Sequence, residues 1–515
     1  MTASSRPEGA CAPSEAGRAA EADFQRGNAL WSAGAHEAAI AAYATAIARD
    51  PQAIEAHNHL GNAFLALGRA ADAAEAYRGG IAQAPSRADL RYNLANALLT
   101  GGDAPQAEAA YRAALALCPD HIGANNNLGT ALRAQARHAE ALGFYEAALR
   151  QRPDSAGTLN NIASTLLALH RPDEAVPLLE RAIALQPAYP EACNNLGGAL
   201  LALDRPQDAI AWFDIALKDE PGLAQARLGK ALALLCEGDF AQGWHHYEAR
   251  WDDPRFAEAA PNDPARLWSG GAVAGRRILL HAEQGLGDTI QFARYAPLLR
   301  ARGAHVILQV QPQLATLLAP LAETCTTDAP PPAHDLHCPL MSLPRAFATR
   351  LDTIPAQPYL RADPASVAAW RARLGPRLRP RIGIAWTGNP NHPEDALRSI
   401  PPASLVAALP GAELHILQPD TPPIPGTHRH TLRDFADTAA LLSCMDLVVS
   451  VDTAIAHLAG ALGHTTIVLL QFGADFRWLR QRTDSPWYPS MRLLRQSALG
   501  DWGGVLAGLG RVVHQ

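Results

Sequence analysis

A spacing of 34 residues dominates the first half of the chain. Proline recurs at this spacing at positions 51, 85, 119, 153, 187 and 221. A second track holds large, mostly aromatic residues: Tyr43, Tyr77, Tyr111, Tyr145, Leu179, Phe213 and Tyr247. A third track holds only small residues: Gly27, Gly61, Ala95, Gly129, Ala163, Gly197 and Ala231. Three tracks with the same spacing and a constant offset predict an array of repeated units, each of which packs only against its neighbours.

The order of these tracks indicates how each unit folds. A small residue lets one helix approach the next closely, the aromatic ring fills the groove between them, and proline ends the second helix. Gly34, Gly68, Gly102 and Gly238 mark the turns between the helices of their units. The period and the pattern resemble the tetratricopeptide repeat. We therefore predict a superhelix of seven helical pairs over residues 20–254, with a concave face that binds protein or peptide.

Asparagine recurs on the first helix of the units, two residues before the small position. The members of this ladder are Asn93, Asn127, Asn161 and Asn195. A side-chain amide both donates and accepts, so it can pair with the N–H and C=O of an extended backbone. The ladder resembles that of eukaryotic O-GlcNAc transferase, which holds acceptor polypeptide, and we predict acceptor binding here. The alternative is that these amides join neighbouring helices.

The second half of the chain has a different organisation. Proline and glycine accumulate over residues 254–275, and short apolar runs then alternate with helical stretches. The runs lie at residues 278–282, 305–310, 382–387, 413–417, 446–450 and 466–470. Such alternation predicts parallel sheets covered by helices. The predicted limits are a disordered tail over 1–19, repeats over 20–254, a connector over 255–275, a first lobe over 276–375 and a second lobe over 376–515.

A glycine loop follows the first strand of the first lobe. In the string EQGLGD, Gly285 and Gly287 let the backbone approach a ligand, and Asp288 supplies a carboxylate at the start of a helix. A dinucleotide fingerprint is disfavoured, because its third glycine would fall at Ile290 and no acid ends the next strand. The loop is therefore interpreted as a ligand site with a candidate base, and the alternative for Asp288 is an ordinary helix cap.

A second motif begins a helix late in the second lobe. Asp452 and Thr453 stand where free helical N–H groups can hold a phosphate, and His457 lies one turn further on the same face. Ligands bind such sheets at the carboxyl ends of strands, so we expect this motif and the glycine loop at one site between the lobes.

These strings resemble the heptosyltransferase-like glycosyltransferases of family 9, which have a GT-B fold of two Rossmann-like lobes. The two signatures are GLGD and D-T-x-x-x-H-L-A-x-A-L-G, and the longer string DFADTAALLSCMDLVVSVDTAIAHLAGALG resembles the bacterial subfamily with tetratricopeptide repeats. The resemblance implies a metal-independent, inverting transferase that needs no cofactor and uses a nucleotide-sugar as co-substrate, bound by the second lobe. It also implies that one lobe of this short domain is trimmed.

The resemblance further implies roles for single residues. Asp288 matches the proposed general base of the family. Donor binding is implied for Gln284, Gly285, Gly287, Thr387, Asn389, Gln418, Asp452, Thr453 and His457. The family commonly offers a lysine to the donor phosphates, but Lys218 and Lys230 are the only lysines and both lie in the repeats. Arg398 is the predicted substitute, with Arg477 and Arg480 behind it.

Composition excludes several other classes of protein. The net charge of −6 gives no field that favours nucleic acid, and no apolar run is long enough to span a membrane. Seven scattered cysteines suit the reducing cytoplasm. We predict a cytoplasmic transferase that glycosylates Ser or Thr of an acceptor protein, with flagellin and adhesins as candidates. The alternatives are a non-catalytic repeat scaffold with a degenerate transferase domain and a transferase for a glycan or lipid-linked acceptor.

Overall fold

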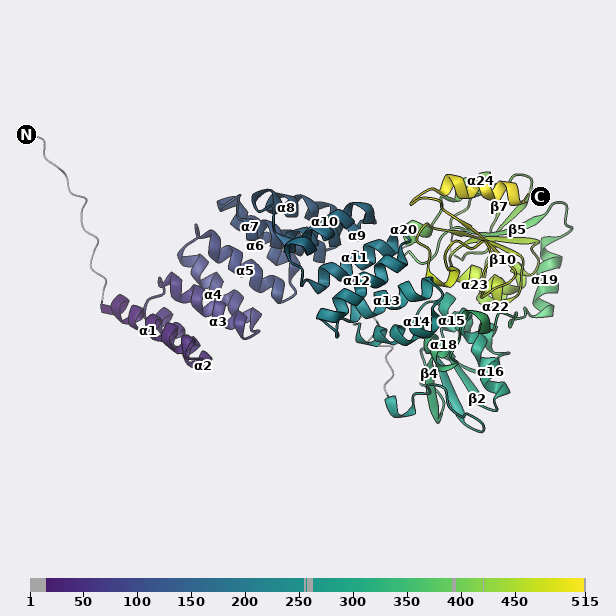
Figure 1. Cartoon of the computed structure of the whole chain (residues 1–515), viewed down its shortest axis with the longest axis horizontal. Helices are drawn as coiled ribbons and strands as arrows, with labels where there is room; N and C mark the ends of the chain where they lie inside the picture. The colour runs from purple at the N-terminus through teal and green to yellow at the C-terminus, as the bar shows by residue number, and fades with distance from the viewer. Residues whose placement is uncertain (1–14, 254–255, 257–262, 391–394, 420, 514–515) are drawn as a thin grey trace, which may run out of the picture. The chain divides into compact units, whose positions relative to one another are not determined.

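The computed structural model describes residues 15–253, 256, 263–390, 395–419 and 421–513. A series of helices is followed by two parallel sheets with covering helices (Figure 1). The chain divides into two compact units, residues 1–195 and 196–515. This division falls inside helix α11 (Pro190–Ala202), so the last repeat helices belong to the same unit as the sheets.

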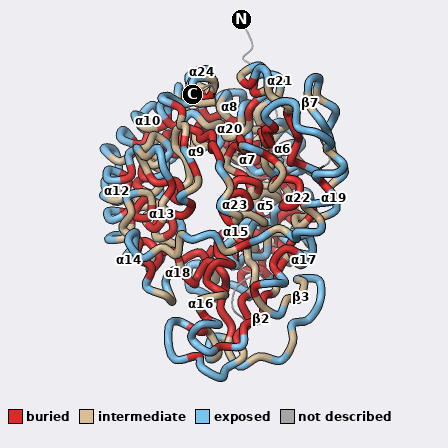
Figure 2. Tube along the Cα trace, turned by 90° about the vertical axis from the view of Figure 1, so that its right-hand side faces the viewer, coloured by how far each residue is buried: buried red, intermediate tan, exposed pale blue. Residues whose placement is uncertain are grey.

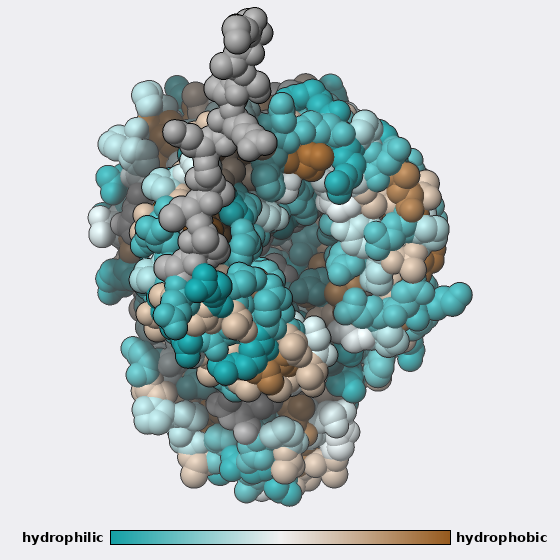
Figure 3. All heavy atoms as spheres, turned by 90° about the vertical axis from the view of Figure 1, so that its left-hand side faces the viewer, coloured by the Kyte–Doolittle hydropathy of each residue, from teal (hydrophilic) through white to brown (hydrophobic). Residues whose placement is uncertain are grey.

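The first unit consists of helical pairs. They are α1 (Glu15–Ser32), α2 (His36–Arg49), α3 (Ile54–Ala66), α4 (Ala70–Gln83), α5 (Ala88–Thr100), α6 (Ala104–Leu117), α7 (Ile122–Ala134), α8 (His138–Gln151), α9 (Ala156–Ala168) and α10 (Pro172–Leu185). Because α1 begins at Glu15, residues 15–19 of the predicted tail are helical, and the rest of that tail lies outside the described residues. The exposed surface over the first helices is mainly hydrophilic, with separate hydrophobic residues (Figure 3).

The small and aromatic tracks pack against each other as the sequence predicts. A Cβ atom added to Gly27 or to Gly61 would lie 2.5 Å from the ring of Tyr43 or Tyr77, and both rings are buried. The helices of a pair therefore approach closely only because the small residue leaves room for the ring. Each tyrosine hydroxyl also donates to an asparagine of the preceding helix, Asn28 at 2.9 Å and Asn62 at 2.7 Å.

The second unit begins with the last repeat helices, which are α12 (Pro206–Asp219), α13 (Ala224–Cys236) and α14 (Phe240–Tyr247), followed by a 3₁₀ turn, Glu248–Asp252. Trp244 and Tyr247 of α14 are buried in the core of the sheet region. The turn adds an ion pair between Arg250 and Glu283, with Arg250 Nε 2.8 Å from Glu283 Oε2 and both side chains buried. Removing one partner would leave a buried charge uncompensated, so the pair fixes the seventh repeat to the first lobe.

Two parallel sheets form the lobes. The first contains β1 (Arg277–His281), β2 (His305–Val310), β3 (Glu323–Thr326) and β4 (Leu336–Pro339), in the order β3-β2-β1-β4. The second contains β5 (Arg381–Ala385), β6 (Glu413–Ile416), β7 (Thr427–His428), β8 (Leu447–Val451), β9 (Thr466–Leu470) and β10 (Met491–Arg495), in the order β10-β9-β8-β5-β6-β7. The predicted solenoid followed by an α/β domain of two lobes is confirmed, and the first sheet is the smaller.

Short helices cover these sheets. They are α15 (Leu286–Phe292), α16 (Ala296–Ala301), α17 (Ala315–Leu318), α18 (Leu343–Ala346), α19 (Pro364–Leu374), α20 (Asp395–Arg398), α21 (Pro402–Ala407), α22 (Phe435–Leu442), α23 (Ala454–Ala461) and α24 (Trp502–Val513). Buried positions concentrate on α15, α22 and α23 (Figure 2). Among the described residues, no helix has the length and apolarity needed to cross a membrane.

Helix α19 lies at the end of the predicted first lobe. The sequence places residues 364–374 in the first lobe, but α19 packs on α22 of the second lobe, and Trp370 Nε1 donates to Asp437 Oδ1 at 2.8 Å. Trp370 accounts for this packing, since its indole needs both an apolar surface and a hydrogen-bond acceptor. Strands β3, β4, β7 and β10 were not predicted, because they are short or carry polar residues without a long apolar run.

Candidate functional site

The order of the strands identifies where a ligand fits. In the second sheet, β5 has β6 as its neighbour on one side and β8 on the other. In the first sheet, β1 likewise has β2 on one side and β4 on the other. A crevice forms at such switch points outside the carboxyl ends of the strands. The segments that directly follow β1, β5 and β8, including the first turns of α15 and α23, carry all the predicted donor-site residues except Arg398 and Gln418.

The glycine loop ends at Asp288, in the first turn of α15. Asp288 Oδ2 accepts the Gly285 N–H at 2.9 Å, which is the helix-capping contact considered as the alternative. Asp288 Oδ1 accepts a hydrogen bond from Arg477 Nη2, and 22% of the Asp288 side chain remains exposed. A carboxylate has about four lone-pair sites, so two contacts leave capacity for a substrate hydroxyl. The cap and a role as base are therefore compatible. Gln284 precedes this loop, and its Nε2 donates to the Tyr247 hydroxyl at 3.1 Å.

The second motif occupies the start of α23. Thr453 caps the helix, with its Oγ1 accepting the Ile455 N–H at 3.2 Å. Asp452 precedes it, and burial, with help from the charge of Asp475, raises the pKa of Asp452 to about 6. A carboxyl group with that pKa is partly protonated near neutral pH and can then donate a hydrogen bond to an anion. The motif can thus accept a phosphate without full charge repulsion.

His457 lies one turn into α23 and is buried. Burial lowers the pKa of His457 well below its ordinary value, and the charges of Arg477, Arg294 and Arg398 lower it further. The imidazole is therefore neutral. Its Nδ1 lies 3.0 Å from the Tyr488 hydroxyl, and its ring stacks on Trp478 with centroids 5.5 Å apart. These contacts fix the ring, so Nε2 points in one direction.

The two motifs meet in the structure, as their sequence positions predict. A Cβ atom added to Gly287 would lie 2.9 Å from His457 Cδ2 and 3.5 Å from Ala454 Cα. The glycine loop of the first lobe therefore lies directly against the start of α23. Asp288, Thr453 and His457 come from segments far apart in the sequence, and this contact brings their segments together at one place.

Three arginines were candidates for the missing lysine. The Arg477 side chain is 9% exposed and bonds Asp288, Gln291 Oε1 at 2.8 Å and Asp475 Oδ1 at 2.7 Å. Arg398 Nε lies 3.1 Å from Asp395 Oδ1, and its charge acts on both Asp452 and His457. Arg480 does not belong to this group, because its ion pairs are with Asp204 and Glu237 of the repeats.

The loops after β5 and β6 are held by two polar side chains. Gln418 Oε1 accepts the Trp386 N–H at 2.7 Å, and its Nε2 donates to Thr387 O at 2.7 Å. Asp395 Oδ2 accepts from Thr387 Oγ1 at 3.0 Å. These contacts give Gln418 and Thr387 a part in shaping the loop after β5. Asn389 is exposed on the same loop. Donor contacts for the three residues stay predictions.

The asparagine ladder joins neighbouring repeats. Asn93 Nδ2 donates to Asn58 Oδ1 at 2.9 Å, and Asn161 Nδ2 donates to Asn126 Oδ1 at 3.3 Å. Asn195 makes the corresponding bond to Asn160, and Asn127 Nδ2 donates to Asn96 Oδ1 at 3.0 Å. The structure thus shows the bonds between neighbouring helices that the alternative interpretation requires. All four ladder residues are half-buried. Asn127 Nδ2 also donates to the Tyr92 hydroxyl at 3.4 Å. The amides of Asn93, Asn161 and Asn195 carry a second hydrogen, so acceptor binding stays a prediction.

Sequence reasoning missed Tyr488 and Arg294. Tyr488 is buried and reaches His457 from the β9–β10 connection, and the Arg294 guanidinium lies 4.5 Å from the centre of the Tyr488 ring. Arg294 Nη1 donates to Trp487 O at 2.9 Å. Neither residue belongs to a repeat track or to one of the two short motifs, so no local pattern singled it out.

Family comparisons agree with both halves of the fold. Models of the tetratricopeptide repeat match residues 27–68, 58–122, 120–188 and 160–224. A model of glycosyltransferase family 9 (heptosyltransferase) matches residues 433–478, which include Asp452, Thr453, His457 and Arg477. The chain thus combines tetratricopeptide repeats with a segment similar to family 9. These matches support a glycosyltransferase with a repeat region.

Individual relatives are similar to parts of the chain. Protein FlbA of Caulobacter vibrioides is 28% identical over 337 residues, covering 54% of this chain and 53% of the relative, so the chain spans about half the length of that protein. The structure of YrrB, described as a tetratricopeptide-repeat protein with an unusual peptide-binding site, shows 24% identity and a TM-score of 0.30, covering 36% of this chain and 97% of the other. A thermophilic repeat protein of Thermus thermophilus shows 25% identity and a TM-score of 0.31, covering 36% of this chain and 100% of the other.

Proposed function

We propose that the chain transfers a sugar from a nucleotide-sugar to Ser or Thr of an acceptor polypeptide, with the superhelix binding the acceptor. The observation that carries the proposal is the contact of Gly287 with His457 and Ala454. It brings a candidate base and a candidate phosphate site to the same crevice. The family 9 match over residues 433–478 supports the transferase class.

In this mechanism Asp288 acts as the general base. Its carboxylate takes the proton of the acceptor hydroxyl while the hydroxyl oxygen attacks the anomeric carbon of the donor sugar. The bond to the nucleoside diphosphate breaks on the opposite face, so the configuration inverts. Arg477 holds the carboxylate through Oδ1, and the Gly285 N–H holds it through Oδ2. This pre-organisation limits the motion needed at the reacting carboxylate.

The leaving diphosphate is stabilised by protein groups in this proposal. The start of α23 offers N–H groups and the positive end of the helix dipole. Arg398 and Arg477 place positive charge near Asp452. The neutral His457 supplies a ring nitrogen that can donate a hydrogen bond. These groups support transfer without a metal ion, since fixed positive charge does the work that a cation would otherwise do.

Transfer can be tested with the full chain. Purified protein is incubated with a panel of nucleoside-diphosphate sugars, with and without EDTA, and released nucleoside diphosphate is measured. Surface proteins from wild-type and deletion cells are then compared by mass spectrometry for a sugar on Ser or Thr. We expect release that survives EDTA and a modification lost on deletion. Loss of activity with EDTA that Mg²⁺ or Mn²⁺ restores would overturn the metal-free mechanism. A modified glycan or lipid with unmodified proteins would favour the alternative acceptor.

A further inference from the structure

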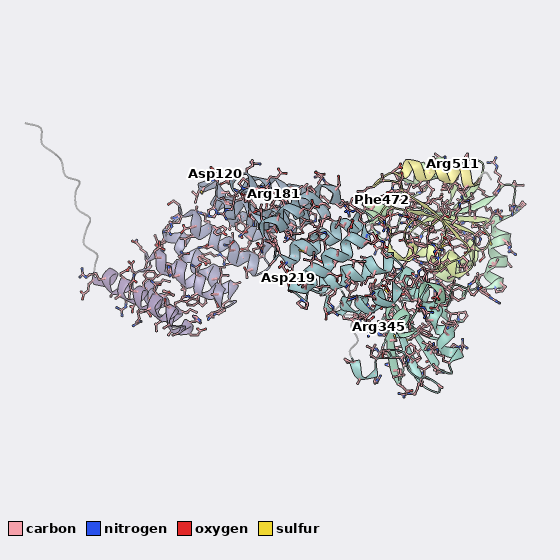
Figure 4. The ribbon with its side chains drawn as sticks, viewed as in Figure 1. Asp120, Arg181, Asp219, Arg345, Phe472 and Arg511 are labelled. Atoms are coloured by element: carbon pink, nitrogen blue, oxygen red, sulfur yellow. The ribbon has the colours of Figure 1, made fainter. Side chains whose placement is uncertain are left out.

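The connection between β9 and β10, residues 471–490, links the candidate site to the repeats. We call it the strap. Its 3₁₀ turn, Phe476–Trp478, carries Arg477, which bonds Asp288 and Gln291 of the first lobe. Three residues later, Arg480 turns to the repeats instead. Phe472, near the start of the strap, is labelled in Figure 4. Two neighbouring arginines thus hold the strap to two different parts of this unit.

Arg480 bridges the turns of the sixth and seventh repeats. Its Nε donates to Asp204 Oδ1 at 2.8 Å, and its Nη1 donates to Glu237 Oε1 at 2.7 Å. Its Nη2 donates to the Asp204 carbonyl oxygen. All three side chains are less than a quarter exposed. A guanidinium that uses its whole fork on fixed acceptors is held in one orientation.

The backbone lies in the left-handed region on both sides of this joint. Each repeat turn places one residue in the left-handed region. This residue is glycine in most units, as at Gly68 with φ 74° and Gly102 with φ 83°. It is Ala136 with φ 59° in the fourth unit and His170 with φ 57° in the fifth. In the sixth unit the corresponding residue is Asp204, with φ 55°. On the strap, Leu479 and Gln481 flank Arg480 with φ 50° and 52°.

These conformations are unfavourable for residues other than glycine, and they persist only where the surroundings impose them. Asp204 adopts the same turn conformation as its counterparts and adds a carboxylate that binds Arg480. A second contact fixes the start of the strap, because a Cβ atom added to Gly473 would lie 2.8 Å from the Ala202 carbonyl oxygen. The strap is thus fitted to the turn of the sixth repeat at two points.

We propose that Arg480 is a positioning residue, which holds the strap against the turns of the sixth and seventh repeats and thereby keeps Arg477 on Asp288. The repeats then complete the catalytic geometry of the second unit in addition to binding an acceptor. The kinetic part of this inference rests on the proposed transferase function. The structural part concerns the order of the strap and is independent of the transferase function.

The test compares Arg480→Ala with a matched control on the same strap. Arg482→Ala removes an arginine whose partner, Asp484 at 2.6 Å, also lies within the strap. Amide hydrogen exchange of residues 475–481 is measured on the full chain, together with kcat/KM for sugar transfer well below the melting temperature. We expect about tenfold faster exchange and at least about a tenfold loss of kcat/KM for Arg480→Ala. Arg482→Ala is expected to match wild type in both.

A double variant separates positioning from simple stabilisation. In the Arg477→Ala background, Arg480→Ala should lower the melting temperature as it does in wild type but should not lower kcat/KM further. Arg480→Lys, which keeps one ion pair, should restore part of the rate. Faster exchange in a protein whose wild-type form transfers no sugar would refute the proposed function and leave the positioning role in place. Unchanged exchange, or equal loss of kcat/KM in both backgrounds, would overturn the positioning role.

Discussion

The contact of Gly287 with α23 makes a sharp prediction for the substitution Gly287→Ala. The added methyl group would stand 2.9 Å from His457 Cδ2 and 3.6 Å from His457 Nε2. His457 cannot turn away freely, since it is buried between Trp478 and the Tyr488 hydroxyl. Overpacking of this kind costs about 1–3 kcal/mol, which the protein can avoid only by separating the glycine loop from α23.

A second effect of the same substitution acts in the opposite direction. Alanine in a helix is favoured over glycine by about 0.5–1 kcal/mol, because glycine loses more backbone freedom on folding. The free energy of unfolding is therefore expected to change by between nothing and a loss of about 2.5 kcal/mol. Donor binding receives no such compensation. We expect kcat/KM to fall by about 5- to 150-fold, which corresponds to the same 1–3 kcal/mol.

The assay combines urea unfolding, binding of the nucleoside diphosphate that the wild-type protein releases, and steady-state transfer. Gly143→Ala in α8 is the matched control, because a Cβ atom there meets nothing within 4 Å. The control should raise stability slightly and leave kcat/KM unchanged. If Gly287→Ala behaved like the control in all three measurements, the glycine loop and α23 would not form one site.

Three further predictions concern single contacts. Asp288→Asn removes the base at almost constant volume, so kcat should fall more than tenfold while donor affinity stays within about twofold, and a variant that kept over about a tenth of wild-type kcat, a loss under ~1.4 kcal/mol, would contradict the role of base. Burial raises the pKa of Asp452 to about 6 in the folded chain, against about 3.9 in the unfolded chain. The folded state therefore binds this proton more tightly and loses about 2–3 kcal/mol of stability as the pH rises from about 4 to about 6. Asp452→Asn should then resist urea better than wild type at pH 7.5 but not at pH 4, and an equal shift at both pH values would refute the assignment. Replacing the four ladder residues Asn93, Asn127, Asn161 and Asn195 by Ala should lower stability by about 0.5–1.5 kcal/mol for each lost bond and should lower kcat/KM for a protein acceptor, with donor hydrolysis unchanged. Tyr77→Phe with Tyr111→Phe removes hydroxyl bonds to Asn62 and Asn96 and serves as the destabilised control, and equal transfer by both variants would show that the ladder only joins repeats.

The amino-acid sequence by itself determined the repeat array and the class of the second half. A period of 34 residues can be found without coordinates, because each unit repeats the same local packing of a small residue against a ring. Alternating apolar runs likewise predicted parallel strands, and the two motifs were correctly expected at the carboxyl ends of β1 and β8. These features depend on residues close together in the chain, and short-range patterns record them.

Only the tertiary structure decided how distant residues share a contact. No local pattern shows that Arg477 bonds Asp288 while Arg480 bonds Asp204 and Glu237. The sequence grouped both arginines as phosphate ligands, since a guanidinium has the same donors wherever it lies. It likewise could not choose between peptide and neighbouring helix as partner of the asparagine ladder, because an amide bonds either equally well. The partner of each side chain depends on distance and burial, and both follow from how the chain packs.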